Sequence, residues 1–351
     1  MKRVFLGTLL SSLLFVSCEG SSVNNHENQE ASDTTVTEIV DSLDFYKNKL
    51  NADPNSPVVL FERAQYYVRH GDVELAEKDL EAILSKDSSI LKVHKLYGDI
   101  ALSKLDLEKS KYHYDYIIER DSSNTGALIG MGKIYAALDN SPIALNYLNL
   151  ALQINPYLPE PYFTKGLIYR SDYYRRVEED PRKEESWDRA ISSFQTAVEQ
   201  EPDYYAAYIE MGVMYDEKGD SIALDYYNSA LEIYPESVEA WYNKGMYFQT
   251  RGYVDDALAS YYTLNKIDET WADPYYNIGY IHLIMTEELD SAKYYFERST
   301  QLDPMYYQAY NNLGLTYEKM GDKVNARRYY QKAIEINPDF QLAKDNLNAI
   351  L

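Results

Sequence analysis

The sequence predicts an all-α solenoid, in which two-helix hairpins follow one another along a single axis. Three observations predict it. The chain repeats itself with a period of about 34 residues from residue 57 to residue 340. Each repeat has a small residue at its eighth position and another near its twentieth. Proline follows the second half of five of the eight repeats, where its missing amide and fixed φ end a helix.

Residues 1–17 have the organisation of a secretory signal peptide. Lys2 and Arg3 precede an apolar run from Val4 to Val16. This run is too short to cross a bilayer of roughly 30 Å as a helix. It ends at Cys18, the only cysteine, so the sequence allows no intramolecular disulfide and no cysteine-based zinc site. We therefore expect an export signal that is removed.

The residues around this cysteine resemble a bacterial lipobox, in which a small residue precedes a cysteine that becomes lipidated and N-terminal. Ser17 is the small residue, although Phe15 stands where leucine is usual and Leu14 lies one place earlier. The resemblance implies that Cys18 carries a lipid. It also implies an exported, membrane-anchored lipoprotein of the cell envelope, on the outer membrane and facing the periplasm or the surface. The alternative is an ordinary cleaved signal with an incidental cysteine.

Residues 18–37 are predicted to form the lipidated N-terminus and a flexible tether. Residues 19–37 are rich in Ser, Asn, Glu and Thr and contain no aromatic residue to bury. A coil of this length spans about 25 Å root-mean-square. Residues 38–56 then show one short helical period, with Ile39, Leu43 and Tyr46 on one face and a stop near Asp53-Pro54. We expect a short helix there that leads into the repeats.

Eight repeats follow, at 57–90, 91–124, 125–158, 159–204, 205–237, 238–271, 272–306 and 307–340. Small residues are expected where the two helices of a hairpin touch. The eighth position is Ala64, Gly98, Gly132, Gly166, Gly212, Gly245, Gly279 and Gly314. The position near twenty is Ala76, Ser110, Ala144, Ala190, Ala223, Ala257, Ala292 and Ala326. The clearest copy adds Tyr310, Leu313, Tyr317, Tyr330, Ala333 and Pro338.

This pattern resembles the tetratricopeptide repeat, a helix-turn-helix unit, over 284 of the 351 residues. The resemblance implies a right-handed superhelical solenoid whose first helices line an inner, concave groove. It also implies binding of a protein or peptide rather than catalysis. Residues 341–351, with Leu342, Leu347 and Ile350, are expected to form a helix that caps the open end.

Charge and motifs exclude several classes of function. Asp and Glu number 56 against 34 Lys and Arg, and the net charge of −22 repels phosphate backbones, so no nucleic acid is expected as a partner. The five histidines fall in no metal-ligand spacing, and His94 and His282 stand where other repeats have rings. The motifs HExxH, GxxxxGK[ST] and GxSxG are absent. We expect no catalytic residue, no metal and no cofactor.

The first candidate binding site is the inner face of the repeats. Position five there is mostly apolar: Phe61, Lys95, Ile129, Phe163, Ile209, Tyr242, Tyr276 and Asn311. Position six of the last three repeats, and the matching place in the final helix, is Asn243, Asn277, Asn312 and Asn346. An amide offers both donors and an acceptor, so this row matches the backbone of an extended peptide, with Tyr242 and Tyr276 beside it. The alternative is that these amides bond within their own hairpins.

The second candidate site is the insertion in repeat four, from Ser171 to Glu185. We expect a loop at one rim of the solenoid, with Tyr173, Tyr174, Arg175 and Arg176 contacting a partner, because aromatic and Arg side chains are enriched at binding hot spots. A solvated loop without function is the alternative.

Together these features predict a membrane-tethered scaffold or adaptor that binds an extended peptide or a partner protein. The alternative is a ligand-capture lipoprotein serving an envelope transport or secretion system. That role needs a deep polar pocket, whereas a solenoid offers a groove. An enzyme is disfavoured because no domain beyond the repeats remains to carry the chemistry.

Overall fold

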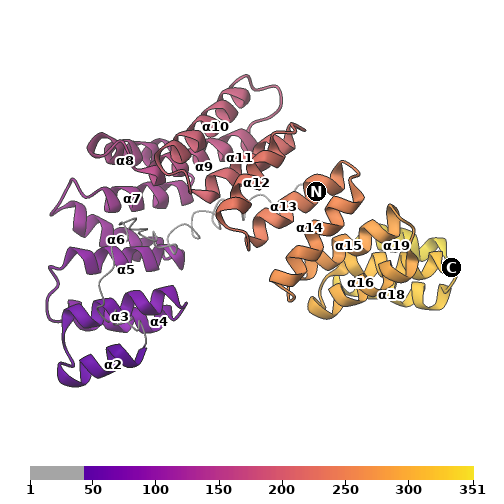
Figure 1. Ribbon diagram of the computed structural model, residues 1–351, viewed down its shortest axis with the longest axis horizontal. Coiled ribbons are helices and arrows are strands. Elements are labelled where there is room, and N and C mark those ends of the chain that lie inside the picture. Colours follow the sequence, from indigo (N-terminus) through magenta and orange to yellow (C-terminus); the bar gives the residue numbers. More distant parts are fainter. Residues whose placement is uncertain (1–42) are drawn as a thin grey trace, which may run out of the picture. The chain divides into compact units, whose positions relative to one another are not determined.

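The computed structural model describes residues 43–351 (Figure 1). Within this range the chain forms 18 helices and no strand, which confirms the all-α class. None of these helices is both long enough and apolar enough to cross a membrane. The predicted export signal, Cys18 and the predicted tether lie outside the described residues.

A short helix, α2 (Leu43–Ala52), precedes eight hairpins and is the described part of the segment expected to lead into them. In the first half of the chain the hairpins are α3 (Pro57–Arg69) with α4 (Val73–Leu84), α5 (Leu91–Ser103) with α6 (Leu107–Ile118), α7 (Thr125–Ala137) with α8 (Ser141–Ile154), and α9 (Pro159–Arg175) with α10 (Arg182–Gln200). In the second half they are α11 (Tyr205–Glu217) with α12 (Ala223–Ile233), α13 (Val238–Thr250) with α14 (Val254–Ile267), α15 (Ala272–Ile284) with α16 (Leu289–Leu302), and α17 (Tyr307–Lys319) with α18 (Lys323–Ile336). The last helix is α19 (Gln341–Ala349).

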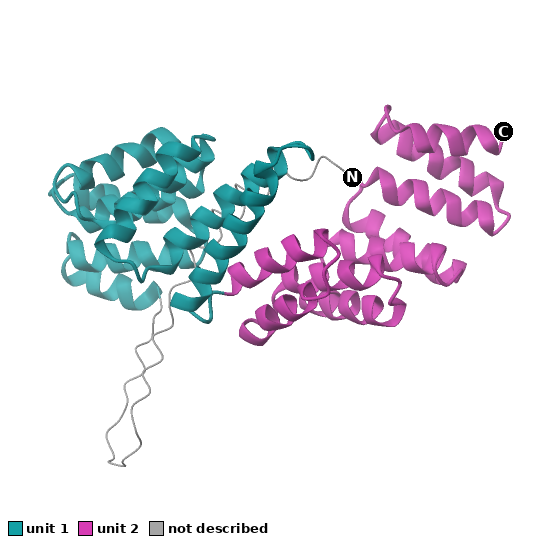
Figure 2. Ribbon diagram, turned by 90° about the horizontal axis from the view of Figure 1, so that it is seen from above, with its two compact units in different colours: residues 1–204 teal, residues 205–351 magenta. Residues whose placement is uncertain are grey.

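The chain divides into two compact units between Tyr204 and Tyr205, where the fourth repeat meets the fifth (Figure 2). The first unit holds α2 to α10 and the second holds α11 to α19. Within each unit the hairpins pack in chain order, so that α6 contacts α7 and α16 contacts α17. Neighbouring first helices also touch, as α7 and α9 do in the first unit and α15 and α17 in the second. Side chains on successive first helices can therefore bond to each other.

In six of the eight hairpins an aromatic ring on the second helix fills the space beside the small residue at position eight. A β-carbon on Gly166 would lie 2.4 Å from Cε1 of Phe194, and one on Gly212 would lie 2.5 Å from Cε1 of Tyr227. The buried rings of this kind are Tyr114, Phe194, Tyr227, Tyr261, Phe296 and Tyr330. The small residue is needed because a ring lies across it, and not only because the two helices are close.

The helix ends follow the local chemistry of the sequence. α8 ends at Ile154, two residues before Pro156, and α18 ends at Ile336, two residues before Pro338. At helix starts, the side chain of Asn124 accepts from the amide of Ala127, and other caps of this kind are made by Asp106, Asn140, Ser237 and Asp322. Such a cap satisfies a backbone amide that has no partner within its helix.

The insertion in repeat four forms a loop only in part, because residues 171–175 and 182–185 are helical and residues 176–181 are not. α9 has 17 residues and α10 has 19, whereas the other hairpin helices have 11 to 14. The connection between them is confined to residues 176–181. The added residues are rich in Arg, Lys and Glu, which favour helices, and they form short-range ion pairs such as Arg189 with Glu185, at 2.5 Å. The insertion therefore lengthens both helices of the hairpin.

Candidate functional site

The asparagines predicted to bind a peptide bond to the repeat before their own. Asn312 in α17 donates to the hydroxyl of Tyr276 in α15, at 3.1 Å. Asn346 in α19 donates to Oδ1 of Asn311 in α17, at 3.0 Å. Burial raises the pKa of Tyr242, and a hydrogen bond with Asn277 opposes that rise. Position six of one repeat is thus joined to position five of the repeat before it three times in succession. We call these three pairs the amide ladder.

The amide ladder accounts for most of the predicted row. Asn277 and Asn311 are buried, and Asn311 also donates to Oδ1 of Asn312, at 3.2 Å. Asn243 differs, because position five of the repeat before it is Ile209, whose side chain has no hydrogen-bonding atom. The three bonds of the amide ladder run between adjacent repeats, whereas the bond from Asn311 to Asn312 lies within one hairpin, as the alternative suggested by the sequence has it. A role for these amides in binding stays a prediction.

Aromatic rings and one carboxylate lie beside the amide ladder. The ring of Tyr242 lies 4.8 Å from that of Trp271, and the ring of Tyr276 stacks on that of Tyr306 at 5.0 Å. Burial raises the pKa of Tyr306, and the nearby carboxylate of Asp273, to which it hydrogen-bonds, raises it further. We call these five residues the tyrosine surface. Except for Asp273 it is uncharged, and its tyrosine side chains are only partly buried.

The first helices of the first unit have a different chemistry. Lys95 forms an ion pair with Asp99 at 2.7 Å, and Lys133 in α7 forms one with Glu160 in α9 at 2.5 Å. Burial works to raise the pKa of Glu160, but the Lys133 ammonium brings it below its ordinary value. This surface is ionic and its charges neutralise each other. The apolar position-five residues expected on the inner face, Ile129 and Phe163 here, are instead buried in the packing.

The four residues predicted at the insertion bond within their own unit. Arg175 pairs with Asp139 and with Asp172, and Arg176 donates to Asp180 at 3.0 Å and to Oγ of Ser186 at 3.1 Å. The ring of Tyr173 packs edge to face against that of Tyr174 at 5.2 Å, and the ammonium of Lys183 lies over it. The structure brings these residues together at the end of α9. Partner contact by them stays a prediction.

A pair of stacked rings, which sequence reasoning missed, joins the two helices of four hairpins. The ring at position 11 of the repeat, on the first helix, lies nearly parallel to a ring on the second helix, three residues after the small residue near position twenty. We call this second place position 23 in every repeat, whatever the length of the segment before it. The pairs are Tyr135 with Tyr147 (5.7 Å, 8°), Tyr215 with Tyr226 (5.4 Å, 19°), His282 with Tyr295 (5.7 Å, 15°), and Tyr317 with Tyr329 (5.3 Å, 16°). The signal was available, because a ring stands at both positions of each of these repeats.

Repeats four and six have serine where the second ring would be. The hydroxyls of Ser193 and Ser260 each donate to a carbonyl one turn earlier in their own helix, at 2.7 and 2.8 Å. The same two repeats have lysine at position seven. Lys165 donates to Asn149 at 3.0 Å and Lys244 donates to Asn228 at 2.8 Å, in each case in the repeat before. A lysine-asparagine bond therefore accompanies the missing ring.

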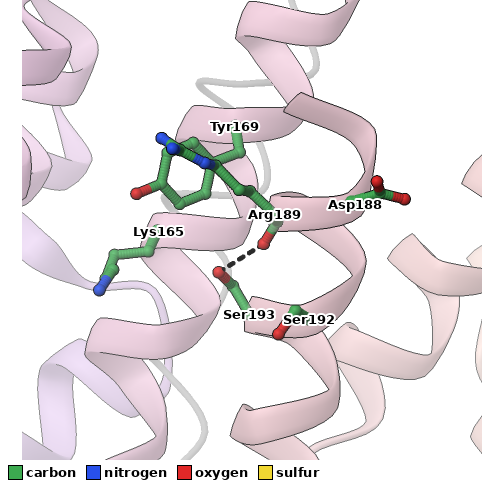
Figure 3. Close-up of a pocket in the computed structure, with 6 residues that line it drawn as sticks. All are labelled: Lys165, Tyr169, Asp188, Arg189, Ser192 and Ser193. Carbon is green, nitrogen blue, oxygen red and sulfur yellow. Dashed lines mark hydrogen bonds between the residues drawn. The ribbon is translucent and has the colours of Figure 1, made fainter. Parts of the chain in front are cut away.

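In repeat four an open pocket of about 400 Å³ lies beside the missing ring. Its lining residues are Lys165, Tyr169, Asp188, Arg189, Ser192 and Ser193. Figure 3 shows the ring of Tyr169 beside the cationic side chains of Lys165 and Arg189, with Asp188 pointing away from them. The guanidinium of Arg189 lies 5.7 Å from the ring centroid. The pocket thus offers one aromatic face and two cations.

The histidines form a buried pair rather than a ligand set. Nδ1 of His94 lies 2.9 Å from Nδ1 of His113, and Nε2 of His94 bonds to the carbonyl of Ser88. Burial lowers the pKa of His113 to about 4, and the positive charge of protonated His94 and of Lys109 contributes. Among residues 43–351, no group of three or more His, Cys, Asp or Glu side chains is arranged to hold a metal ion.

Comparison with known sequences places a repeat family on part of the chain. The tetratricopeptide repeat family matches residues 307–340, the last of the eight repeats. The BBSome complex member BBS4 of Bos taurus is 24% identical over 226 residues, which cover 64% of this chain and 41% of the bovine protein. The photosystem I assembly protein Ycf3 of Cyanophora paradoxa is 28% identical over 127 residues, 30% of this chain and 71% of that protein. The chain therefore spans less than half the length of the bovine relative.

Solved structures show the same fold. The APC/C hetero-tetramer Cut9-Hcn1 matches with a TM-score of 0.56 at 17% identity, over 88% of this chain and 58% of that one. A monomeric mutant of IFIT1 with Gppp-AAAA matches with a TM-score of 0.57 at 18% identity, over 83% of this chain and 66% of that one. With the family match, these likenesses confirm a solenoid of tetratricopeptide type.

Proposed function

We propose that this chain is a membrane-tethered scaffold or adaptor, which binds an extended segment of a partner protein along the first helices of its second unit. The observation that carries the proposal is the tyrosine surface, where partly buried rings stand on neighbouring first helices. Rings of this kind supply large contact areas at little entropic cost, and tyrosine is enriched at protein interfaces.

The amide ladder makes this surface rigid. Two pairs of the amide ladder fix Tyr242 and Tyr276 to the next first helix, and Tyr306 stacks on Tyr276. The three rings are therefore held in place before any ligand binds. A surface that is ordered in advance loses less entropy on binding. Neighbouring first helices lie about 10 Å apart, close to three residues of extended chain at roughly 3.3 Å each. Successive rings are therefore in step with every third side chain of such a segment.

Charge indicates what kind of segment would bind. The net charge of the chain is −22, and Asp273 places a carboxylate within the tyrosine surface. Ring faces attract cations, and an acidic field raises the association rate of basic ligands. We infer that the segment is apolar with Lys or Arg side chains. Asn243, which has no place in the amide ladder, is the amide most suited to bond its backbone.

The tether and the lipid are the second part of the proposal. Cys18 at the end of the apolar run would anchor the chain, and residues 19–37 would let the first repeat lie about 25 Å from the membrane. In this proposal the scaffold is an exported lipoprotein of a bacterial cell envelope. The names of the relatives, a member of a complex and an assembly protein, support a role in gathering proteins. The pocket in repeat four is open rather than deep, so it gives the ligand-capture alternative little support.

Crosslinking in intact cells, followed by affinity capture from detergent-solubilised membranes and mass spectrometry, tests the proposal. The variant that replaces Tyr242 and Tyr276 with Ala should lose partners that the unaltered chain captures. Tyr157→Ala is the matched control, because Tyr157 is 75% exposed and belongs to the first unit and not to the tyrosine surface. Circular dichroism must show that both variants remain helical. Equal capture by all three chains would contradict the proposed surface.

A further inference from the structure

The pocket in repeat four occupies the place where four other hairpins keep a ring of their own. In those hairpins the position 23 ring lies 5.3 to 5.7 Å from the position 11 ring. In repeat four the position 11 ring is Tyr169, but position 23 is Ser193, whose hydroxyl turns back to its own helix. Both residues line the pocket. We propose that this pocket is a binding site for an aromatic side chain, supplied by a partner polypeptide.

The face of Tyr169 provides the platform for that ring. Its side chain is only partly buried, and Figure 3 shows its ring beside the side chain of Arg189. The guanidinium of Arg189 lies 5.7 Å from the centroid of the Tyr169 ring, and the side chain of Arg189 is more than half exposed. An exposed arginine can move aside or stack on the incoming ring from the other side. In the second arrangement the incoming ring lies between a tyrosine and a cation.

Lys165, which lines the pocket, and its partner Asn149 favour a phenol. In repeat seven the hydroxyl of Tyr295, the position 23 ring, hydrogen-bonds with Tyr262 of the preceding repeat. The residue equivalent to Tyr262 in front of repeat four is Asn149, to which Lys165 donates at 3.0 Å. Burial lowers the pKa of Lys165, so a new acceptor beside its ammonium would be favourable. A tyrosine hydroxyl in this place would meet both an amide and an ammonium.

Repeat six shows that a serine at position 23 does not by itself leave space. Ser260 is 2% exposed against 9% for Ser193, and the ring of Phe248 meets that of Tyr253 from its own hairpin at 6.2 Å. The hairpin of repeat six thus carries a ring of its own beside position 11. Repeat four places Lys165, Arg189 and two serine hydroxyls around its pocket instead.

We infer that the ring is not supplied by the part of this chain that precedes α2, which has no Tyr or Trp. Residues 1–42 contain only two such rings, Phe5 and Phe15, and both lie in the predicted export signal. The choice of a polypeptide as the source rests on the proposed scaffold function. The slot itself does not depend on the proposed function. It is inferred from the four other hairpins, in which a ring occupies the equivalent place.

A substitution that supplies the missing ring tests the slot. Ser193→Tyr in the full chain should leave the thermal midpoint unchanged or raise it, because the new ring can stack on Tyr169 as in the other repeats. Ser260→Tyr is the matched control and should lower the midpoint, since that position is closed. A fall of more than about 5 °C for Ser193→Tyr, similar to the control, would show that no ring-shaped slot exists.

Binding is tested with the blocked tripeptide N-acetyl-Gly-Tyr-Gly-amide, observed by saturation-transfer NMR, with N-acetyl-Gly-Leu-Gly-amide as the aliphatic control. The tyrosine peptide should bind the unaltered chain and bind Ser193→Tyr at least tenfold more weakly. Tyr169→Ala, which removes the platform without filling the slot, should also lose it. Equal binding of both peptides, or full binding by these variants, overturns the proposal.

Two further measurements separate the sources of the ring. If p-cresol binds as tightly as the tyrosine peptide, a free phenol replaces the polypeptide as the ligand. If sedimentation shows that the unaltered chain self-associates and Ser193→Tyr does not, the ring comes from a second copy of the chain. Neither result depends on the tyrosine surface. Partner capture by the Tyr242 and Tyr276 variant tests the proposed function, and the experiments on Ser193 and Tyr169 test the pocket, so either proposal can fail alone.

Discussion

Asn312 donates a hydrogen bond to the hydroxyl of Tyr276, 3.1 Å away on the first helix of the preceding repeat. Both residues stand on the surface expected to hold a ligand, yet they join two repeats of the solenoid. The same residues can therefore contribute to stability and to recognition. Substitutions have to separate the two effects before any change in affinity can be interpreted.

We expect Asn312→Ala to lower the free energy of unfolding by about 1 kcal/mol, because a partly buried hydroxyl loses its partner. Asn243→Ala should leave it unchanged, since Ile209 gives Asn243 no equivalent partner. Urea unfolding followed by circular dichroism measures both. A larger loss for Asn243→Ala than for Asn312→Ala would contradict the amide ladder. Asn243→Ala is then the cleaner variant for measuring affinity.

The stacked rings should carry more stability than the lone ring of repeat four. Tyr226→Ala removes the second half of a stack and should cost about 2 to 4 kcal/mol, part of it from the ring contact itself. Tyr169→Ala should cost less, because no ring faces Tyr169 from its own second helix. Tyr226→Phe keeps the ring and serves as the control. Equal losses for the two alanine variants would show that the stacks add little.

The buried histidine pair predicts a loss of stability in acid. The pKa of His113 is about 4 in the folded chain and 6.5 ordinarily, so the unfolded chain binds a proton more readily. The contribution is complete above about pH 6.5, falls as the pH drops toward 4, and amounts to about 3 kcal/mol at most. Thermal unfolding of the unaltered chain and of His113→Gln, compared from pH 7.5 to pH 4, measures it. The gap between their pH profiles should close on acidification, and parallel profiles would exclude the effect.

Cys18 is expected to carry the lipid. Cys18→Ala in the producing cells should move the chain from the membrane fraction to the soluble fraction, because the lipid is the only anchor that the proposal provides. Cys18→Ser is a second variant with nearly the same size of side chain. Immunoblots of the two fractions give the result. An unchanged membrane fraction for both variants would show that the chain is held by something other than this cysteine.

The period and the small residues predicted the fold because each of them acts within one hairpin. Gly166 and Phe194 belong to the same repeat, so their contact can be inferred from one copy of the pattern. The amide ladder joins position six of one repeat to position five of the repeat before it, and this offset depends on how far successive hairpins are shifted. A single repeat does not contain that information. The asparagines were therefore assigned to a ligand.

The insertion and the pocket show a second limit of prediction from the sequence. Length alone suggested a loop, whereas the residues from Ser171 to Glu185 favour helix, and this could have been recognised from their composition. The pocket is present because repeat four has no aromatic residue at position 23, where four other repeats have one. Ser193 is unremarkable until the rings at the same place in other repeats, such as Tyr147 and Tyr226, are found to stack.

The bonds from Lys165 to Asn149 and from Lys244 to Asn228 also give the hairpins a fixed order. Each lysine requires an amide at one place in the hairpin directly ahead of it. If repeat three were deleted, Asp115 would take the place of Asn149, and a neutral contact would become an ion pair. Gene duplication or shuffling of whole repeats would thus create mismatched neighbours, even though every repeat is a hairpin of two helices. The eight hairpins resemble one another in shape, but in their contacts they are not interchangeable parts.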